Sequence, residues 1–184
     1  MKTKTRSLLT AGCALWLALA SVRTAEPAQA AVERVGVYAS RIVPFAHFWS
    51  EPARQDRDAL IASAKAAKTA GDTARFAALN AQLVAAQKRD HLQVFSTAPA
   101  EEAMVALKDK LPAIQKELGV VRLISKWDVA ALTGVAEANR LEVTDRLARE
   151  FAPDEKRQKT IEQMKKAKPL PLDEARKLAD AEKL

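Results

Sequence analysis

The stretch "AKTAGDTARFAALNAQL", residues 67–83, contains the clearest structural signal in the chain. Alanine and charged residues dominate on both sides and favour helix. Between them, Gly71 is typical of a helix end and Asp72 of a new helix start. The connection is so short that the two helices must fold back on each other. The stretch therefore predicts the turn of an antiparallel helical hairpin.

The hairpin is predicted over residues 50–96, with Ser50 capping its first helix. Large apolar residues are scarce on that helix, whereas on the second they recur at spacings of 3 and 4, as a narrow two-helix seam requires. We assign to this seam Leu60, Ile61, Phe76, Leu79 and Leu83. Four apolar residues fall off the stripe and are candidates for contact with another molecule: Val84, Leu92, Val94 and Phe95.

The segments around the hairpin predict a small body of strands and helices. A strand is expected over residues 33–43, ended by Pro44, and the aromatic residues of "PFAHFWS" are expected in the core. After the hairpin, a helix capped by Ser96 or Thr97 is expected to kink at Pro112 and to end at Gly119.

The following residues predict the rest of the body. Strands are expected over 120–124 and 129–134, then a loop over 137–140. A short helix is expected to begin with Thr144 as its cap. The fold class is therefore α+β and mostly helical, with a small β-strand body and a projecting antiparallel hairpin arm.

The first 30 residues have the pattern of a secretory signal peptide. A basic start is followed by a charge-free run of 16 residues, which is short for a bilayer helix of about 20. Ala28-Gln29-Ala30 fits an A-x-A cleavage site. Ala18-Leu19-Ala20 is a second candidate, and an uncleaved anchor helix is the alternative. We expect cleavage, a periplasmic mature chain, and loss of Cys13, the only cysteine.

The domain is expected to cover residues 31–152, with a charged, partly disordered tail over 153–184. Lys165, Lys166 and Lys168 form a small basic patch in this tail, for which a solvated face is the favoured interpretation. The formal charge of +7 falls to +4 without residues 1–30, because these contain four basic residues and one acid. A modest positive charge on an exported chain suggests an anionic membrane surface as a neighbour and argues against nucleic acid.

The sequence contains no recognisable catalytic or metal-binding motif. Its two histidines, His47 and His91, are not part of H-E-x-x-H, and neither a P-loop nor G-x-S-x-G occurs. Asp128, beside Trp127, is predicted to cap a turn, and His91 is expected to be exposed. We therefore expect no enzyme activity, no cofactor and no metal.

Four pieces of the chain, taken in order, resemble the Skp/OmpH family of periplasmic chaperones. "RVGVYASRIV" is similar to the family's first strand, and "AKTAGDTARFAALNAQLVAAQ" to the tip of its helical arm. "IQKELGVVRLISKWDVAAL" resembles its helix-Gly-strand-turn-strand passage. "LEVTDRLAREF" resembles the start of its terminal helix. The residues that match that start in type are Glu142, Val143, Thr144, Asp145 and Leu147.

This resemblance covers residues 33–152 and implies a function. In the family, strand bodies trimerise and the hairpins project as arms around a cavity. The chain would then be an exported, ATP-independent holdase that binds unfolded outer-membrane or envelope proteins on its arms. The arms here are short, and the tail has no counterpart in the family. The alternative is a structural or envelope-tethering protein that places its basic tail on an anionic surface.

Overall fold

The computed structural model describes residues 33–181. The predicted signal peptide, its cleavage sites and Cys13 lie outside these residues. Within them the chain is mostly helical and contains one small sheet, as the expected α+β class requires. No helix between residues 33 and 181 is long and apolar enough to cross a membrane.

Three short strands form the sheet: β1 (Val35–Tyr38), β2 (Arg122–Ser125) and β3 (Arg140–Glu142). Their order is β2-β1-β3, and β1 pairs in parallel with both neighbours, so that Val37 lies opposite Ile124 on one side and Glu142 on the other. Parallel pairing requires long crossover connections. The connection from β1 to β2 contains α1 to α5, and the connection from β2 to β3 contains α6. Strands β2 and β3 are the two edges of the sheet.

The first crossover begins with α1 (Ile42–Phe48), where a longer strand was predicted. The prediction that Pro44 ends the strand is wrong: β1 ends at Tyr38 and Pro44 lies in the first turn of α1. There a missing N–H costs nothing, because first-turn amides have no helical partner. Of the ring residues expected in the core, Phe45, His47 and Phe48 are half-buried, while Trp49 is exposed.

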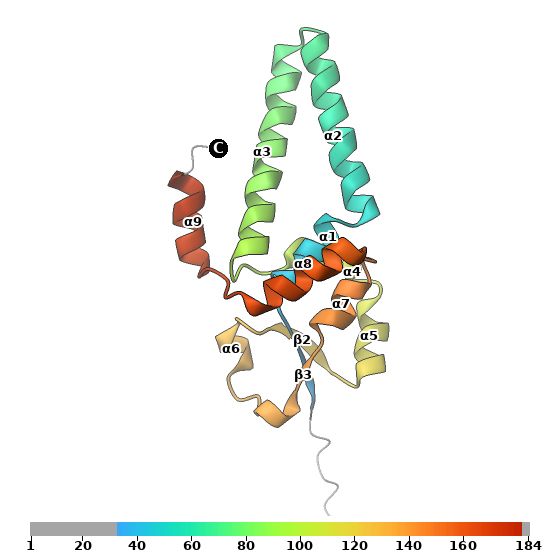
Figure 1. Ribbon diagram of the computed structural model, residues 1–184, viewed down its shortest axis with the longest axis vertical. Coiled ribbons are helices and arrows are strands. Elements are labelled where there is room, and N and C mark those ends of the chain that lie inside the picture. The colour runs from blue at the N-terminus through green and yellow to red at the C-terminus, as the bar shows by residue number, and fades with distance from the viewer. Residues whose placement is uncertain (1–32, 182–184) are drawn as a thin grey trace, which may run out of the picture. The chain divides into compact units, whose positions relative to one another are not determined.

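Two long helices follow, α2 (Glu51–Thr69) and α3 (Thr73–Phe95), and they lie side by side (Figure 1). The turn between them has the predicted chemistry. Gly71 has φ of 73°, which suits glycine, and the Asp72 carboxylate accepts a hydrogen bond from the Arg75 amide at 3.0 Å. Ser50 is the N-cap of α2, although its hydroxyl makes no capping bond.

The long helix predicted after the hairpin is two helices, α4 (Glu101–Leu107) and α5 (Leu111–Leu118). Pro112 lies in the first turn of α5 instead of kinking one continuous helix, and Gly119 ends α5 with φ of 63°, as predicted. Neither Ser96 nor Thr97 caps α4, whose N-cap is Ala100. The Ser96 hydroxyl instead donates back to the Leu92 carbonyl at the end of α3.

The predicted strand over residues 129–134 is wrong. Its first residues form a short helix, α6 (Val129–Leu132), because Asp128 caps it by accepting from the Ala131 amide at 2.9 Å. The third strand is β3, which includes Arg140 from the predicted loop and follows a 3-10 turn (Glu137–Asn139). Asp128 is thus a cap, as predicted.

Helix α7 (Thr144–Arg149) packs against α1. Thr144 is its first residue and not its cap, which is Val143. The Thr144 hydroxyl accepts a hydrogen bond from the amide of Ala39, 105 positions away in the sequence, at 2.8 Å. The side chain therefore ties α7 to the end of β1.

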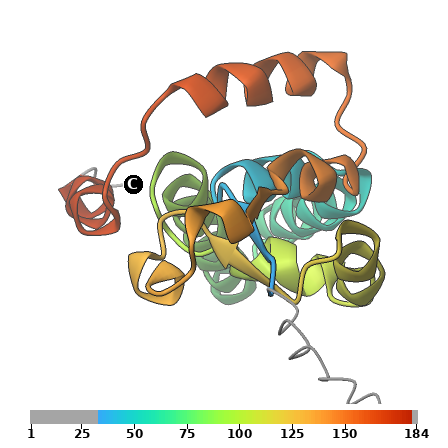
Figure 2. The ribbon, with the colours of Figure 1, turned by 90° about the horizontal axis from the view of Figure 1, so that it is seen from below.

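The segment predicted as a partly disordered tail carries two helices, α8 (Glu155–Lys166) and α9 (Leu172–Ala181). Figure 2 shows α8 crossing the side of α1 and α7, and α9 standing beside α3. Ile161 of α8 is completely buried. Its cluster includes Ile42 and Ala148, and this apolar contact explains why a charge-dense segment is folded.

Candidate functional site

A hollow of about 850 Å³ lies between the ends of α2 and α3 that are nearest to α1 and α4. We call it the root hollow. Its walls come from α1, α2, α3 and α4, which follow one another in the chain. Its apolar lining includes Phe48, Leu60, Ile61, Leu83 and Val94. It is the most apolar of the described hollows.

The spacing between α2 and α3 explains the position of the hollow. The only buried residues of α2 are Ala64 and Ala67, which lie toward the turn. Alanine lets two helix backbones approach closely, and Figure 1 shows the helices converging toward the turn and diverging toward α1. At the diverging end Leu60, Ile61 and Leu83 line the root hollow.

Charged side chains surround the apolar lining. Arg89 of α3 pairs with Glu102 of α4 at 2.6 Å. The Arg57 guanidinium lies 4.2 Å from the centroid of the Phe48 ring and donates to the Phe48 carbonyl at 3.3 Å. A guanidinium over an aromatic face is attracted by the ring's electrons. These contacts join α3 to α4 and α2 to α1 at the rim of the hollow.

Burial shifts the pKa values of two side chains in the wall of the root hollow. Burial raises the pKa of the Asp90 carboxyl, although the neighbouring Arg89 acts in the opposite direction. Burial also lowers the pKa of His47 below its usual value, against the weaker opposing effect of Glu102. The His47 Nδ1 is buried and has no hydrogen-bond partner within residues 33–181. Both shifts favour the neutral form, as expected in a partly dry site.

The residues predicted to form the seam divide into two groups. Leu60, Ile61 and Leu83 line the root hollow, whereas Phe76 and Leu79 lie nearer the turn, and all five are half-buried. The Lys68 ammonium of α2 lies 5.7 Å from the Phe76 ring centroid, so that ring faces α2.

The four predicted contact residues do not gather in one place. Val94 lines the root hollow, but Val84, Leu92 and Phe95 do not. Val84 and Phe95 are 37% and 56% exposed, respectively, and Leu92 is half-buried. The Phe95 ring packs edge-on against the exposed His91, with centroids 5.8 Å apart. Helix α9 also packs on α3, as the pairing of Lys88 with Asp180 shows.

The polar wall of the root hollow was missed by sequence reasoning. From the sequence, His47 is expected only as one ring of the aromatic cluster in the core, and Asp90 is assigned no role. A signal was available for Asp90, which lies at helical spacing from the apolar stripe residues Leu83 and Ala86. No sequence pattern places His47, on α1, in the wall of the same hollow.

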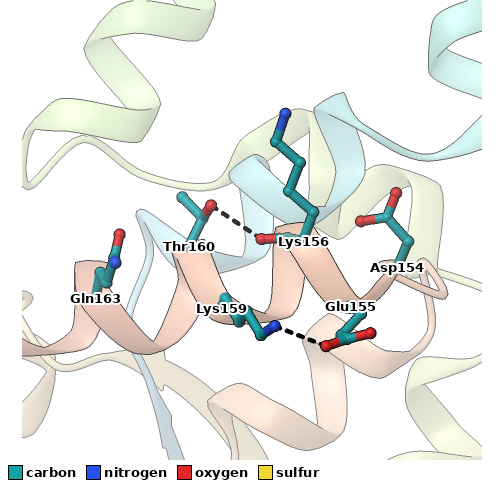
Figure 3. Close-up of a pocket in the computed structure, with 6 residues that line it drawn as sticks. All are labelled: Asp154, Glu155, Lys156, Lys159, Thr160 and Gln163. Atoms are coloured by element: carbon teal, nitrogen blue, oxygen red, sulfur yellow. Dashed lines mark hydrogen bonds and ion pairs between the residues drawn. The ribbon is translucent and has the colours of Figure 1, made fainter.

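A second hollow, of about 560 Å³, is a shallow, charged face of α8 (Figure 3). Lys159 pairs there with Glu155 at 2.7 Å, and the Thr160 hydroxyl donates to the Lys156 carbonyl at 3.1 Å. The interactions run along one helix and do not converge on a point. We therefore assign this face to solvent.

No three His, Cys, Asp or Glu side chains in the described part of the chain come together in a way that could hold a metal ion. Comparison with family models, with curated proteins and with solved structures finds no match to this chain.

Proposed function

We propose that the chain is an exported, ATP-independent holdase chaperone that binds unfolded outer-membrane or envelope proteins. The observation that carries the proposal is the root hollow, a large apolar space with a charged rim between two long helices. Such a surface offers an extended apolar segment many weak contacts and no single exact complement. The order of elements also resembles the Skp/OmpH family over residues 33–152, which supports the same function.

In this proposal α2 and α3 form an antiparallel hairpin arm that projects from the strand body. Helix α2 has 19 residues, or about 28 Å at 1.5 Å per residue. An arm of this length encloses little space by itself, so the proposal includes self-association through the body, with a trimer favoured. As edge strands of the sheet, β2 and β3 are suited to such an interface.

The proposal places the main client contact in the root hollow. Leu83 and Val94 of α3 line it together with Leu60 and Ile61 of α2. Val84, Leu92 and Phe95 are candidates for a second contact outside it.

The test is suppression of aggregation of a urea-unfolded β-barrel protein by the full chain, followed by light scattering. The double variant L83S/V94S removes one leucine and one valine from the hollow. The matched control V84S/L92S removes the same residue types from the same helix outside the hollow. Each apolar side chain contributes about 1.5–3 kcal/mol when fully buried, so losing two half-buried ones should weaken client binding about tenfold or more.

Retained helicity by circular dichroism is required of both variants. A larger loss of protection in L83S/V94S supports the root hollow, and a larger loss in V84S/L92S moves the contact to the outer face of α3. Full protection by both folded variants, or no protection by the parent, refutes client binding on the arm.

A second candidate function is a structural or tethering role on an anionic membrane surface. The observation that favours it is the exposure of Lys166 and Lys168 at and beyond the last residue of α8. Co-sedimentation with anionic vesicles that depends on these lysines, in a chain that gives no protection against aggregation, would favour tethering.

A further inference from the structure

A third hollow, of about 240 Å³, lies beside the end of β1. We call it the basic hollow. It is lined by residues that follow β1 and β2, by the last turn of α8 and by the residues directly after α8. Its charged lining residues are all cations: Arg41, Lys126, Lys165, Lys166 and Lys168. Within residues 33–181 no aspartate or glutamate lines it. Sites that bind ligands in parallel sheets commonly lie beyond the carboxyl ends of the strands, which is where this hollow lies.

Arg41 is the most informative of these cations. It is only 6% exposed, and its Nη1 donates to the Ala167 carbonyl at 3.2 Å. Its Nε is buried without a hydrogen-bond partner, and the guanidinium makes no ion pair with any described residue. A buried charge without a counterion is unfavourable, and the burial also lowers the pKa of Arg41. An anion in the hollow would relieve that cost.

The other cations come from two separate elements. The Lys126 amide donates to the Tyr38 carbonyl at 2.9 Å, which holds the ends of β1 and β2 together, and the Lys126 ammonium lies 5.3 Å from the Trp127 ring centroid. Lys165 is already paired with Asp145 at 2.5 Å and with Glu162 at 2.7 Å. Lys126, Lys166 and Lys168 make no ion pair within the described residues and are exposed.

We propose that the basic hollow binds a phosphate group. A guanidinium presents a planar set of donors that matches phosphate oxygens, and nearby ammonium groups add charge without demanding one geometry. Several cations around one concave surface also concentrate anions there. The phosphate belongs either to a small soluble molecule or to an anionic lipid headgroup. This site is independent of client binding on the arm, since it lies on the body and α8.

The experiment uses the full chain and two probes. Inorganic phosphate is titrated by calorimetry in a low-salt, phosphate-free buffer, and vesicles of phosphatidylglycerol in phosphatidylcholine are tested by co-sedimentation against phosphatidylcholine alone. The variant K126Q/K168Q removes two exposed cations of the hollow, and R41Q removes the buried one. The matched control K156Q/K159Q removes the same charge from the face of α8 shown in Figure 3, outside the hollow.

We expect one phosphate per chain, with affinity at least fivefold weaker in K126Q/K168Q and unchanged within twofold in K156Q/K159Q. R41Q should abolish binding; if it fails to fold, the exposed-lysine pair alone decides. Vesicle binding with the same dependence on Lys126 and Lys168, but no response to inorganic phosphate, assigns the phosphate to a lipid headgroup. Equal weakening by the control pair, or no binding of either probe, overturns the proposal.

Discussion

The burial of Ile161 leads to a prediction about the charged C-terminal segment. Ile161 is completely buried, although α8 around it is dense in charge. The residues of its cluster come from the end of β1, from α1 and from α7: Ala39, Ile42, Ala46 and Ala148. Replacing Ile161 with alanine in the full chain therefore removes apolar contact between α8 and the body.

The magnitude follows from the atoms removed. Isoleucine to alanine deletes three carbons, and at about 0.8 kcal/mol per buried methylene the transfer contribution is about 2.4 kcal/mol. A residual cavity raises the cost, so measured values for such changes lie at about 2–5 kcal/mol. One kcal/mol shifts the melting temperature by roughly 2–4 °C in a chain of this size. The transfer contribution of about 2.4 kcal/mol therefore corresponds to a melting temperature that is lower by about 5–10 °C.

The assay is urea unfolding of parent and variant, followed by circular dichroism. Leu178 on α9 is 50% exposed and is the matched control, because Leu178→Ala removes the same number of carbons from the same C-terminal segment. We expect the control to lose less than about 1 kcal/mol. If Ile161→Ala costs no more than Leu178→Ala, α8 does not pack on the body in solution and the assignment of the segment to the folded unit is wrong.

Three further predictions concern the sheet, the root hollow and the assembly. A Cβ on Gly36 would lie 2.6 Å from the Leu123 Cδ2, so Gly36→Ala should lower the free energy of unfolding by about 1–3 kcal/mol; an unchanged urea midpoint would contradict this close packing. The pKa of His47 is lower in the folded chain than its usual value of about 6.5. As pH falls below about 6.5, this histidine is therefore protonated more readily in the unfolded chain than in the folded chain, so the free energy of unfolding should decrease from pH 7.5 to pH 5.5. His47→Phe should reduce that decrease, which thermal melts at both pH values will show, and equal slopes in parent and variant would exclude His47. Because β2 and β3 are sheet edges, light scattering should detect self-association, with a trimer favoured, and a monomer at all concentrations would remove that part of the chaperone proposal.

Several local features were predictable because neighbouring residues decide them. The turn at Gly71, the caps Asp72 and Asp128, and the end of α5 at Gly119 are all as predicted. Each depends on a side chain or a backbone angle within a few residues. The α+β, mostly helical class was also predictable, because alanine and charge dominate the long segments. The function, the oligomer and the signal peptide remain predictions.

The errors occur where distant contacts override local preference. β3 has only three residues and no readable alternation, and it is a strand because Arg140 and Glu142 pair with β1. Threonine is a common N-cap residue, yet the Thr144 hydroxyl accepts a hydrogen bond from the amide of Ala39, which is far away in the chain. The charge around Ile161 predicts a segment that is part helix and part disordered, and its local pattern does not show the buried cluster that holds α8 against the body.

The root hollow and the basic hollow show the same division between local and long-range effects. Two alanine-rich helices joined by a glycine turn could be predicted from residues 67–83, because propensity and capping act within a few residues. The divergence of these helices at the end near α1, where His47 of α1 and Asp90 of α3 line one apolar space, depends on long-range packing. Long-range packing also brings Arg41 and Lys126, which are far apart in the chain, together with Lys168 beside the end of β1. Parallel pairing of β1 with β2 joins the ends of these strands, and that pairing is a contact between segments more than 80 positions apart.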